Sequence, residues 1–170
     1  MTILVTGATG KVGSRLVKRL AQRGDRVRAL IRDRARAAQL NTNQIELVEG
    51  NLLDPDSLHA AVRGADAIVH CAAFFRGATP EQTHSVNDRG TQSLAVAARD
   101  AGVKRFVFLS TGLVYGSTGG RPASEDDACA PTVAYPMSKL AAEGFLLVHR
   151  GIPGNAARIL RKKYSSSRYP

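Results

Sequence analysis

A triplet of glycines at regular spacing near the start of the chain limits its fold more than any other feature. Gly7, Gly10 and Gly13 closely follow the apolar run Ile3-Leu4-Val5 and stand where a helical pattern begins. Such a turn between a strand and a helix brings backbone N–H groups close to a pyrophosphate, whose charge the helix N-terminus favours. The pattern predicts the first unit of a dinucleotide-binding domain, and the alternative is a turn with a purely structural role.

The turn supplies the first group of candidate cofactor contacts. Thr6 and Thr9 either add hydroxyl contacts to a phosphate or complete the turn. The residues expected to hold the cofactor here are Gly7, Thr9, Gly10, Lys11, Val12 and Gly13.

Apolar runs and helical patterns alternate along the rest of the chain, which is typical of βαβ units that feed a parallel sheet. The helix after the glycine turn is expected to bury Val12, Leu16 and Leu20 and to end at Gly24. The expected strands span residues 3–5, 27–31, 45–48, 67–70 and 106–109, and the run 158–160 fits the start of a sixth. Further helices are expected over residues 34–40, 55–64, 81–101 and 135–149. The predicted fold class is α/β, a Rossmann-type doubly wound parallel sheet in three αβα layers.

Length and composition fit a single domain of this class. The 170 residues are 44% hydrophobic, which is enough for one core. We expect an NAD(P)-binding domain over residues 1–161 and a basic, disordered tail over residues 162–170. No leader or membrane segment is predicted, because the first strand runs straight into the glycine turn, and a cytoplasmic protein is expected.

The net charge of +10 raises the question of nucleic-acid binding. After Glu143 the chain has no acidic residue, so much of the excess lies at its end. Solvated basic faces and tails are common, and no specific nucleic-acid partner is predicted. Cys71 and Cys129 are the only cysteines and lie far apart, so neither a disulfide scaffold nor a metal site is expected. Cys71 is expected to act as a buried small hydrophobe.

The end of the second strand bears on the choice of cofactor. A cofactor with a free ribose 2′-hydroxyl usually meets Asp or Glu at that point, whereas this chain has Ile31 followed by Arg32. A guanidinium can hold a 2′-phosphate in a bidentate manner, so NADP is favoured over NAD. Asp33 is close enough to weaken this inference, and solvation is the alternative role for Arg28 and Arg34.

Short segments after the third and fourth strands provide more candidate contacts. Leu53 and Asp54 are expected beside the adenine, where the Asp54 carboxylate either accepts from the adenine amino group or caps the next helix. Ala72 and Ala73 are small, so a cofactor can lie against the backbone there. His70, at the end of the fourth strand, is expected to be a packing residue rather than a catalyst.

Two residues on the last predicted helix point to acid–base chemistry. Tyr135 and Lys139 stand four apart, so both side chains project from one face. A phenol is a poor acid or base at neutral pH, but a neighbouring ammonium favours the phenolate and lowers the pKa of the phenol. Tyr135 can then exchange a proton with a substrate oxygen while a hydride moves at the adjacent carbon. Thr111, just past the fifth strand, is placed to hold that oxygen, and Ser110 is the less favoured candidate.

Taken together, these residues make the chain resemble the extended short-chain dehydrogenase/reductase family, which comprises NAD(P)-dependent sugar epimerases, dehydratases and dihydroflavonol-type reductases. The segments that carry the resemblance follow the family's order and span residues 6–13, 70–73, 86–91, 109–116 and 135–139. The resemblance implies that Lys139 also binds the nicotinamide ribose, that Thr111 takes the family's Ser/Thr role, and that Asn87 lies in a helix lining the site. The segment 27–33 is similar to that of NADP-using reductases in the family.

The resemblance also implies a small-molecule substrate and pairing of two copies through helices on one side of the sheet. The expected activity is hydride transfer at a carbinol or keto carbon of a sugar nucleotide or similar compound. In the family a proline-containing loop and a mainly helical substrate domain follow the sixth strand, whereas here Arg161 is followed by Lys162-Lys163 and seven more residues. The substrate domain is therefore expected to be missing, and the alternatives are a non-catalytic NADP(H)-binding module or an inactive truncated fragment.

Overall fold

The computed structural model describes residues 1–40, 43–75, 77–148 and 157–162. Within these residues, six strands form one sheet in the order β3-β2-β1-β4-β5-β6, and every neighbouring pair is parallel. The strands are β1 (Thr2–Thr6), β2 (Arg26–Ile31), β3 (Ile45–Glu49), β4 (Ala67–His70), β5 (Arg105–Thr111) and β6 (Ala157–Lys162). This is the strand order of the Rossmann fold, and the direction of winding reverses between β1 and β4.

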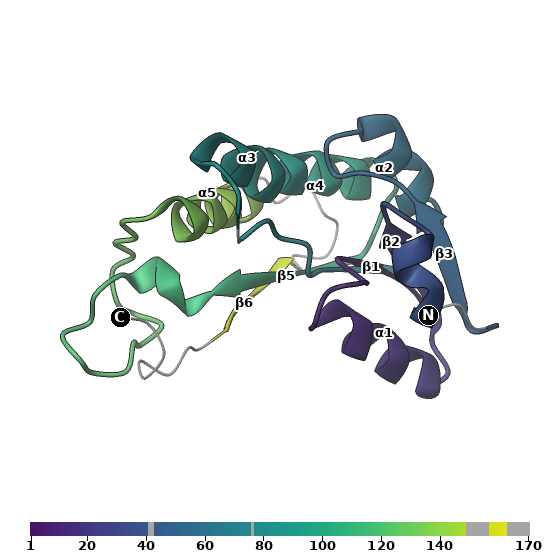
Figure 1. Cartoon of the computed structure of the whole chain (residues 1–170), viewed down its shortest axis with the longest axis horizontal. Coiled ribbons are helices and arrows are strands. Elements are labelled where there is room, and N and C mark those ends of the chain that lie inside the picture. Colours follow the sequence, from purple (N-terminus) through teal and green to yellow (C-terminus); the bar gives the residue numbers. More distant parts are fainter. Residues whose placement is uncertain (41–42, 76, 149–156, 163–170) are drawn as a thin grey trace.

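Helices cover both faces of the sheet. Figure 1 shows α1 on one face and α2, α4 and α5 side by side on the other, so the predicted doubly wound α/β fold is confirmed. The helical elements are α1 (Gly13–Gln22), η1 (Ala35–Leu40), α2 (Pro55–Val62), α3 (Pro80–His84), η2 (Ser85–Arg89), α4 (Gly90–Asp100), η3 (Gly112–Tyr115) and α5 (Ala134–Val148).

Two apolar cores lie on the two faces, because successive strand residues point to opposite sides of a sheet. Leu4 belongs to the core under α2, α4 and α5, together with Phe106 and Phe108. Its neighbour Val5 belongs to the core under α1 and η1. Strands buried on both faces explain why the central apolar runs are continuous rather than alternating.

The buried face of α1 differs from the one predicted. The helix buries Gly13, Val17, Leu20 and Ala21, so of the three expected residues only Leu20 is buried, and Leu16 is partly buried. Val12 is 42% exposed because it is the N-cap residue, outside the helix that starts at Gly13. The apolar stripe is therefore set by Gly13 and by the residues four, seven and eight positions later.

Several boundaries also differ from expectation. The segment 34–40 forms a 3₁₀-helix over Ala35–Leu40, and the long helix expected over 81–101 contains a π-helical turn at Ser85–Arg89. The strand β6 includes Lys162, one residue beyond the expected domain boundary at 161. Residue 149 of the last predicted helix and residues 163–170 of the predicted tail lie outside the described residues.

Other expectations concern surfaces. The helix α5 exposes Met137, Ala141, Gly144 and Leu147 along one face, and pairing of two copies through this helix stays a prediction. In the described part of the chain, we find no helix with the length and apolar character that crossing a bilayer requires.

The glycine turn packs directly against the loop that follows β4. Gly7 has a φ of +65°, and a Cβ added there would lie 2.6 Å from the backbone nitrogen of Ala72. The Gly10 N–H donates to the Gly7 carbonyl at 3.0 Å, and a Cβ at Gly13 would overlap that same carbonyl oxygen. The turn therefore excludes side chains for two reasons, its backbone conformation and its contact with β4.

Gly24 provides a matched control for the contact, because its φ is +87° but a Cβ there would meet no atom within 4 Å. We expect Gly24→Ala to reduce the free energy of unfolding by about 1–2 kcal/mol, the cost of a left-handed backbone. Gly7→Ala should cost about 1–3 kcal/mol more, because the chain must also move away from Ala72. Urea unfolding of both variants measures the difference, and equal losses would show that the close approach adds no constraint.

Candidate active site

The candidate site lies at the carboxyl edge of the sheet, where the segments that follow β1 and β4 meet. The glycine turn follows β1 there, and Cys71 and Ala72 follow β4. In open α/β sheets, ligands bind in the crevice at this switch point. Gly7 and Gly13 let the turn close tightly, since a Cβ at either position would meet backbone atoms. Gly10 is exposed and carries no side chain that would keep a diphosphate away from the N-terminus of α1. These residues fit a dinucleotide.

Arg32 and Asp33, which bear on the choice between NADP and NAD, lie in a hollow beside the glycine turn. Its volume is about 260 Å³, and it is lined by Thr9, Arg32, Asp33 and Arg36. The Asp33 carboxylate accepts from the Ala35 N–H at 2.8 Å and lies 3.9 Å from the Arg36 guanidinium. Asp33 is thus engaged at the start of η1, and Arg36 adds a cation that the sequence did not single out.

Asp54 acts as the N-cap of α2. Its side chain accepts from the N–H groups of Asp56 at 3.2 Å and Ser57 at 3.4 Å. Leu53 beside it is 50% exposed. The capping alternative is therefore present in the structure, and contact of Leu53 and Asp54 with an adenine stays a prediction.

A buried histidine ties β1, β4 and α4 together. His70 Nδ1 lies 2.5 Å from the Thr6 hydroxyl, and Nε2 lies 2.9 Å from the Thr91 hydroxyl. The Thr91 O–H donates to the Asn87 carbonyl at 2.6 Å, while the Thr6 oxygen accepts from the Ala72 N–H at 3.3 Å. The Thr91 oxygen must then accept from Nε2–H, and Nδ1 accepts from the Thr6 O–H.

This assignment gives His70 one donor nitrogen and one acceptor nitrogen, as in a neutral imidazole. Burial lowers the pKa of His70 well below its usual value, and the positive charge of Lys139 acts in the same direction. The prediction that His70 packs rather than catalyses agrees with this arrangement. Its ring also stacks on Phe108, with 5.5 Å between the centroids.

Asn87 connects the loop after β4 to α5. Its side-chain oxygen accepts from the Phe74 N–H at 2.7 Å, and its amide donates to the Phe74 carbonyl at 2.9 Å. The amide also donates to the Ser138 hydroxyl at 3.1 Å. The π-helical turn that contains Asn87 is of the kind often found at functional sites. Asn87 therefore holds the backbone beside Ala72 and Ala73 in position.

Lys139 is almost fully buried next to this loop. The residue is 1% exposed, and its Nζ lies 3.9 Å from the centroid of the Phe108 ring. Burial lowers the pKa of Lys139 to about 7, although negative charge on Cys71 and on Glu143 would raise it. Cys71 is only partly buried, in contrast to the expectation of a buried residue, but this burial still raises the pKa of its thiol to about 11. The thiol is therefore neutral at neutral pH, and Glu143 is the effective acidic group.

The other two predicted catalytic residues lie nearby. Tyr135 is partly exposed one helical turn before Lys139, and its ring centroid is 4.4 Å from that of Phe75. The Thr111 oxygen accepts from the Leu113 N–H at 3.2 Å, which leaves the hydroxyl proton to donate elsewhere. Ser110 is engaged differently, since its hydroxyl donates to the Glu143 carboxylate.

The sequence reasoning missed Phe75, Glu143 and the role of Arg161. Phe75 stands in an apolar segment with no motif, and only its ring contact with Tyr135 identifies it. Glu143 follows Lys139 by four residues, so helical spacing placed it on the same face, and this signal was available. The partner of Glu143, Arg161, comes from β6 and could not be found by local spacing.

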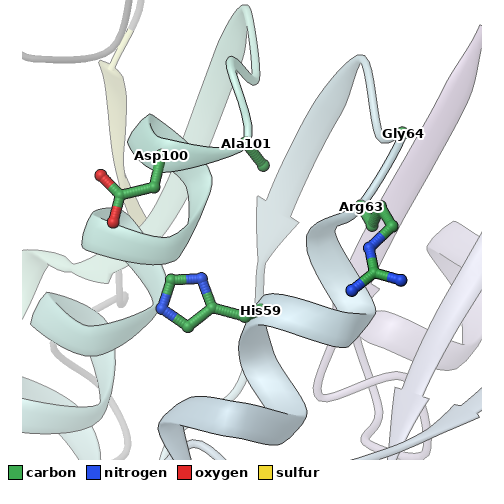
Figure 2. A pocket seen from close by; sticks show the side chains of 5 residues that line it. All are labelled: His59, Arg63, Gly64, Asp100 and Ala101. Carbon is green, nitrogen blue, oxygen red and sulfur yellow. The ribbon is translucent and has the colours of Figure 1, made fainter.

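A second hollow lies at the opposite edge of the sheet, before β4 and β5, and is lined by His59, Arg63, Gly64, Asp100 and Ala101. All five residues are exposed, and Figure 2 shows Arg63 and Asp100 on opposite sides of His59. Its polar groups do not converge on one point, which favours the carboxyl edge as the functional site. Among the described residues, no group of three or more His, Cys, Asp or Glu could hold a metal ion.

The strand order and the glycine turn at the switch point define a Rossmann-type dinucleotide-binding domain. The chain belongs to the NAD dependent epimerase/dehydratase family, whose sequence profile matches residues 3–161. The resemblance drawn from the motifs is thereby confirmed.

Several relatives are similar to large parts of this chain. Sterol demethylase protein B of Methylococcus capsulatus is 40% identical over 124 residues, which are 72% of this chain and 37% of that protein. A 3 beta-hydroxysteroid dehydrogenase/Delta 5-->4-isomerase of Mycobacterium tuberculosis is 36% identical over 165 residues, which are 89% of this chain and 44% of that protein. The chain thus spans less than half the length of these curated relatives.

Solved structures agree in fold. A double mutant of DesIV, the dTDP-glucose 4,6-dehydratase of Streptomyces venezuelae, was solved with NAD bound and is 32% identical with a TM-score of 0.86. The match covers 95% of this chain and 55% of that one. A short-chain dehydrogenase/reductase superfamily protein of Agrobacterium tumefaciens, also with NAD bound, is 35% identical with a TM-score of 0.79 over 95% of this chain and 48% of that one.

The buried ammonium predicts a pH-dependent cost in stability. Lys139 has a pKa of about 7 in the folded chain, whereas an exposed lysine, as in the unfolded chain, has a pKa of 10.5. Between pH 7 and pH 10.5 the unfolded chain therefore binds more protons than the folded chain. Stability must therefore rise with pH in this window. We expect Lys139→Met to stabilise the chain by about 1–4 kcal/mol at pH 6.5, as when buried ions are replaced by apolar residues.

The gain should shrink as the pH rises from about 7 toward 10.5. Urea unfolding at three pH values measures it, with the exposed Lys18→Met as control. A Lys139→Met variant that is less stable than the parent at pH 6.5 would contradict the account.

Proposed function

We propose that this domain transfers a hydride between NADP(H) and a carbinol or keto carbon of a small molecule. The observation that carries the proposal is a buried lysine beside the loop after β4, one helical turn from Tyr135, at the same sheet edge as the glycine turn. A bound nicotinamide cofactor would supply or accept the hydride at this edge. The glycine turn would hold its diphosphate, and Lys139 would contact its nicotinamide ribose.

Each of the three candidate catalytic residues has a distinct task. Tyr135 exchanges a proton with the substrate oxygen, and the Lys139 ammonium favours the charged form of a phenol beside it. Thr111 donates a hydrogen bond from its hydroxyl to the same substrate oxygen and keeps its proton, which orients the reacting carbon. Asn87 and His70 act indirectly, because they hold the loop after β4 against the glycine turn.

The surroundings of Tyr135 bear on the substrate. The Phe75 ring is 38% exposed and contacts the ring of Tyr135. Such an aromatic surface suits a flat apolar ring system. The names of two relatives refer to sterol and 3 beta-hydroxysteroid substrates, whereas that of DesIV refers to a sugar nucleotide. We favour a hydroxyl or keto group carried on an apolar ring system, with a sugar nucleotide as the alternative.

Two steps test the function. Titration of the chain with NADPH and NADH, followed by nicotinamide fluorescence, tests binding, and we expect saturation with both and tighter binding of NADPH. Oxidation of NADPH in the presence of a 3-ketosteroid or a UDP-4-keto-sugar then tests turnover. We expect Tyr135→Phe to preserve cofactor affinity and to slow turnover by about 100-fold or more, because the proton donor is lost.

Met137→Leu, an exposed change two residues away on α5, serves as the control and should alter neither step. Saturable binding without turnover of either substrate would support the alternative of a non-catalytic cofactor-binding module. A chain that gives no saturable signal with either nucleotide would refute both functions.

The preference for NADP rests on the hollow beside the glycine turn. Arg32 and Arg36 line it, and each can donate to a 2′-phosphate in a charge-assisted hydrogen bond. We expect Arg32→Ala to weaken NADPH binding by about 10-fold or more, as hydrogen bonds to charged groups contribute about 1.5–3 kcal/mol. The affinity for NADH should not change.

Arg34 is the matched control, because it lies in the same exposed segment but pairs with Glu49. Its substitution by alanine should leave the ratio of the two affinities unaltered. If Arg32→Ala weakened the binding of NADPH and NADH equally, Arg32 would instead contact a part of the cofactor that both nucleotides share.

A further inference from the structure

A polar cluster behind the candidate site joins the last strand to the helix that carries Tyr135 and Lys139. Its centre is Glu143, which is 1% exposed. The Arg161 guanidinium donates to Glu143 from two nitrogens, with Nη2 2.6 Å from Oε2 and Nε 3.1 Å from the same oxygen. A third nitrogen of Arg161, Nη1, donates to the Tyr115 hydroxyl at 2.7 Å. The Ser110 hydroxyl also donates to Glu143.

The members of this cluster adjoin the candidate catalytic residues in sequence. Ser110 precedes Thr111, and Tyr115 closes the 3₁₀ turn that starts after Thr111. Glu143 stands one helical turn beyond Lys139 on α5. The cluster thus connects the strand end that carries Thr111 with the helix face that carries Lys139, and it does so through β6.

A buried carboxylate persists only when its oxygens are hydrogen-bonded and its charge is balanced. Both oxygens of Glu143 accept from Arg161, and the guanidinium also lies over the Tyr115 ring, 4.9 Å from its centroid. The Glu143 carboxylate raises the pKa of Arg161 further above its ordinary value, as expected for a close pair. Two charged groups are therefore held at one defined separation inside the domain.

We propose that Glu143 and Arg161 are positioning residues for the hydride-transfer site, which fix the Lys139 face of α5 against the Thr111 end of β5. This inference rests on the proposed function for its purpose. Neither residue contacts the cofactor or substrate in this role. The pair acts through its neighbours, and the carboxylate supplies negative charge next to the buried Lys139 ammonium.

The groups around Lys139 determine the electrostatic consequence. His70 and Cys71 face it from β4 and the loop that follows, and Tyr135 and Glu143 share its helix face. His70 is neutral and Cys71 is a neutral thiol at pH 7, so Glu143 is the acidic group that favours the ammonium. Loss of the carboxylate should lower the pKa of Lys139 further and leave less ammonium at neutral pH.

The titration of Lys139 is measurable by NMR of a chain labelled with ¹⁵N-lysine, with Lys139→Met to assign its Nζ signal. The chain has only six lysines, so the signals can be separated. We expect Glu143→Gln to lower the titration midpoint by about 0.5 pH units or more, because an opposite charge nearby is removed. Arg158→Met, an exposed change on the same strand β6, is the control and should not move the midpoint.

The single variant Arg161→Met leaves Glu143 buried without its partner and is expected to fold less stably. The double variant Glu143→Gln/Arg161→Met removes both charges, so we expect it to recover the stability lost in Arg161→Met. Its Lys139 midpoint should nevertheless stay below that of the parent chain, although it should lie above that of Glu143→Gln because the positive charge of Arg161 is also removed. A merely structural role would restore both quantities together.

An unchanged midpoint in Glu143→Gln, or an equal shift in Arg158→Met, would overturn the inference even if the chain binds NADPH normally. A shifted midpoint in a chain that binds no nicotinamide cofactor would uphold the coupling of Glu143 to Lys139 and refute the proposed function. The two hypotheses therefore fail in different measurements.

Discussion

The close approach of the first glycine turn to the loop after β4 is the contact on which the rest of this structure depends. At Gly7 the backbones of the segments that follow β1 and β4 meet without a side chain between them, next to the N–H of Ala72. Hydrogen bonds from Thr6 through His70 to Thr91 hold β1, β4 and α4 at that separation. The arrangement of the chain at the switch point is therefore a product of backbone geometry reinforced by a neutral, buried imidazole.

Electrostatics on the other side of the site work against stability. Lys139 is an ammonium-bearing side chain in a nearly dry position above an aromatic ring, and burial lowers its pKa to about 7. An apolar residue would stabilise the fold more at neutral pH. A buried titratable group that lowers stability and lies close to neighbours with shifted pKa values is typical of functional sites. The Glu143 carboxylate offsets part of that loss of stability because it favours the Lys139 ammonium, and Arg161 in turn balances the charge of the carboxylate.

Predictions from sequence were most accurate where one local pattern determined the outcome. The glycine spacing and the alternation of apolar runs predicted the α/β class and the strands correctly, and helical spacing placed Tyr135 and Lys139 on one face. The predictions were less accurate for α1, because the exposure of Val12 depends on where the helix starts. The π-helical turn at Ser85–Arg89 was not predicted, and the contacts of Asn87 within it are made with Phe74 and Ser138, which lie in other segments of the chain.

The amino-acid sequence by itself determined the elements, their order and the residue types at the carboxyl edge, because periodicity, glycine and helical spacing are local properties. Only the tertiary structure decided which distant groups meet. The pairing of Arg161 with Glu143, the hydrogen bonds of His70 and the ring contact between Phe75 and Tyr135 each join separate segments. Burial at those meeting points is what shifts the pKa of Lys139, and burial is a property of the folded chain rather than of any segment.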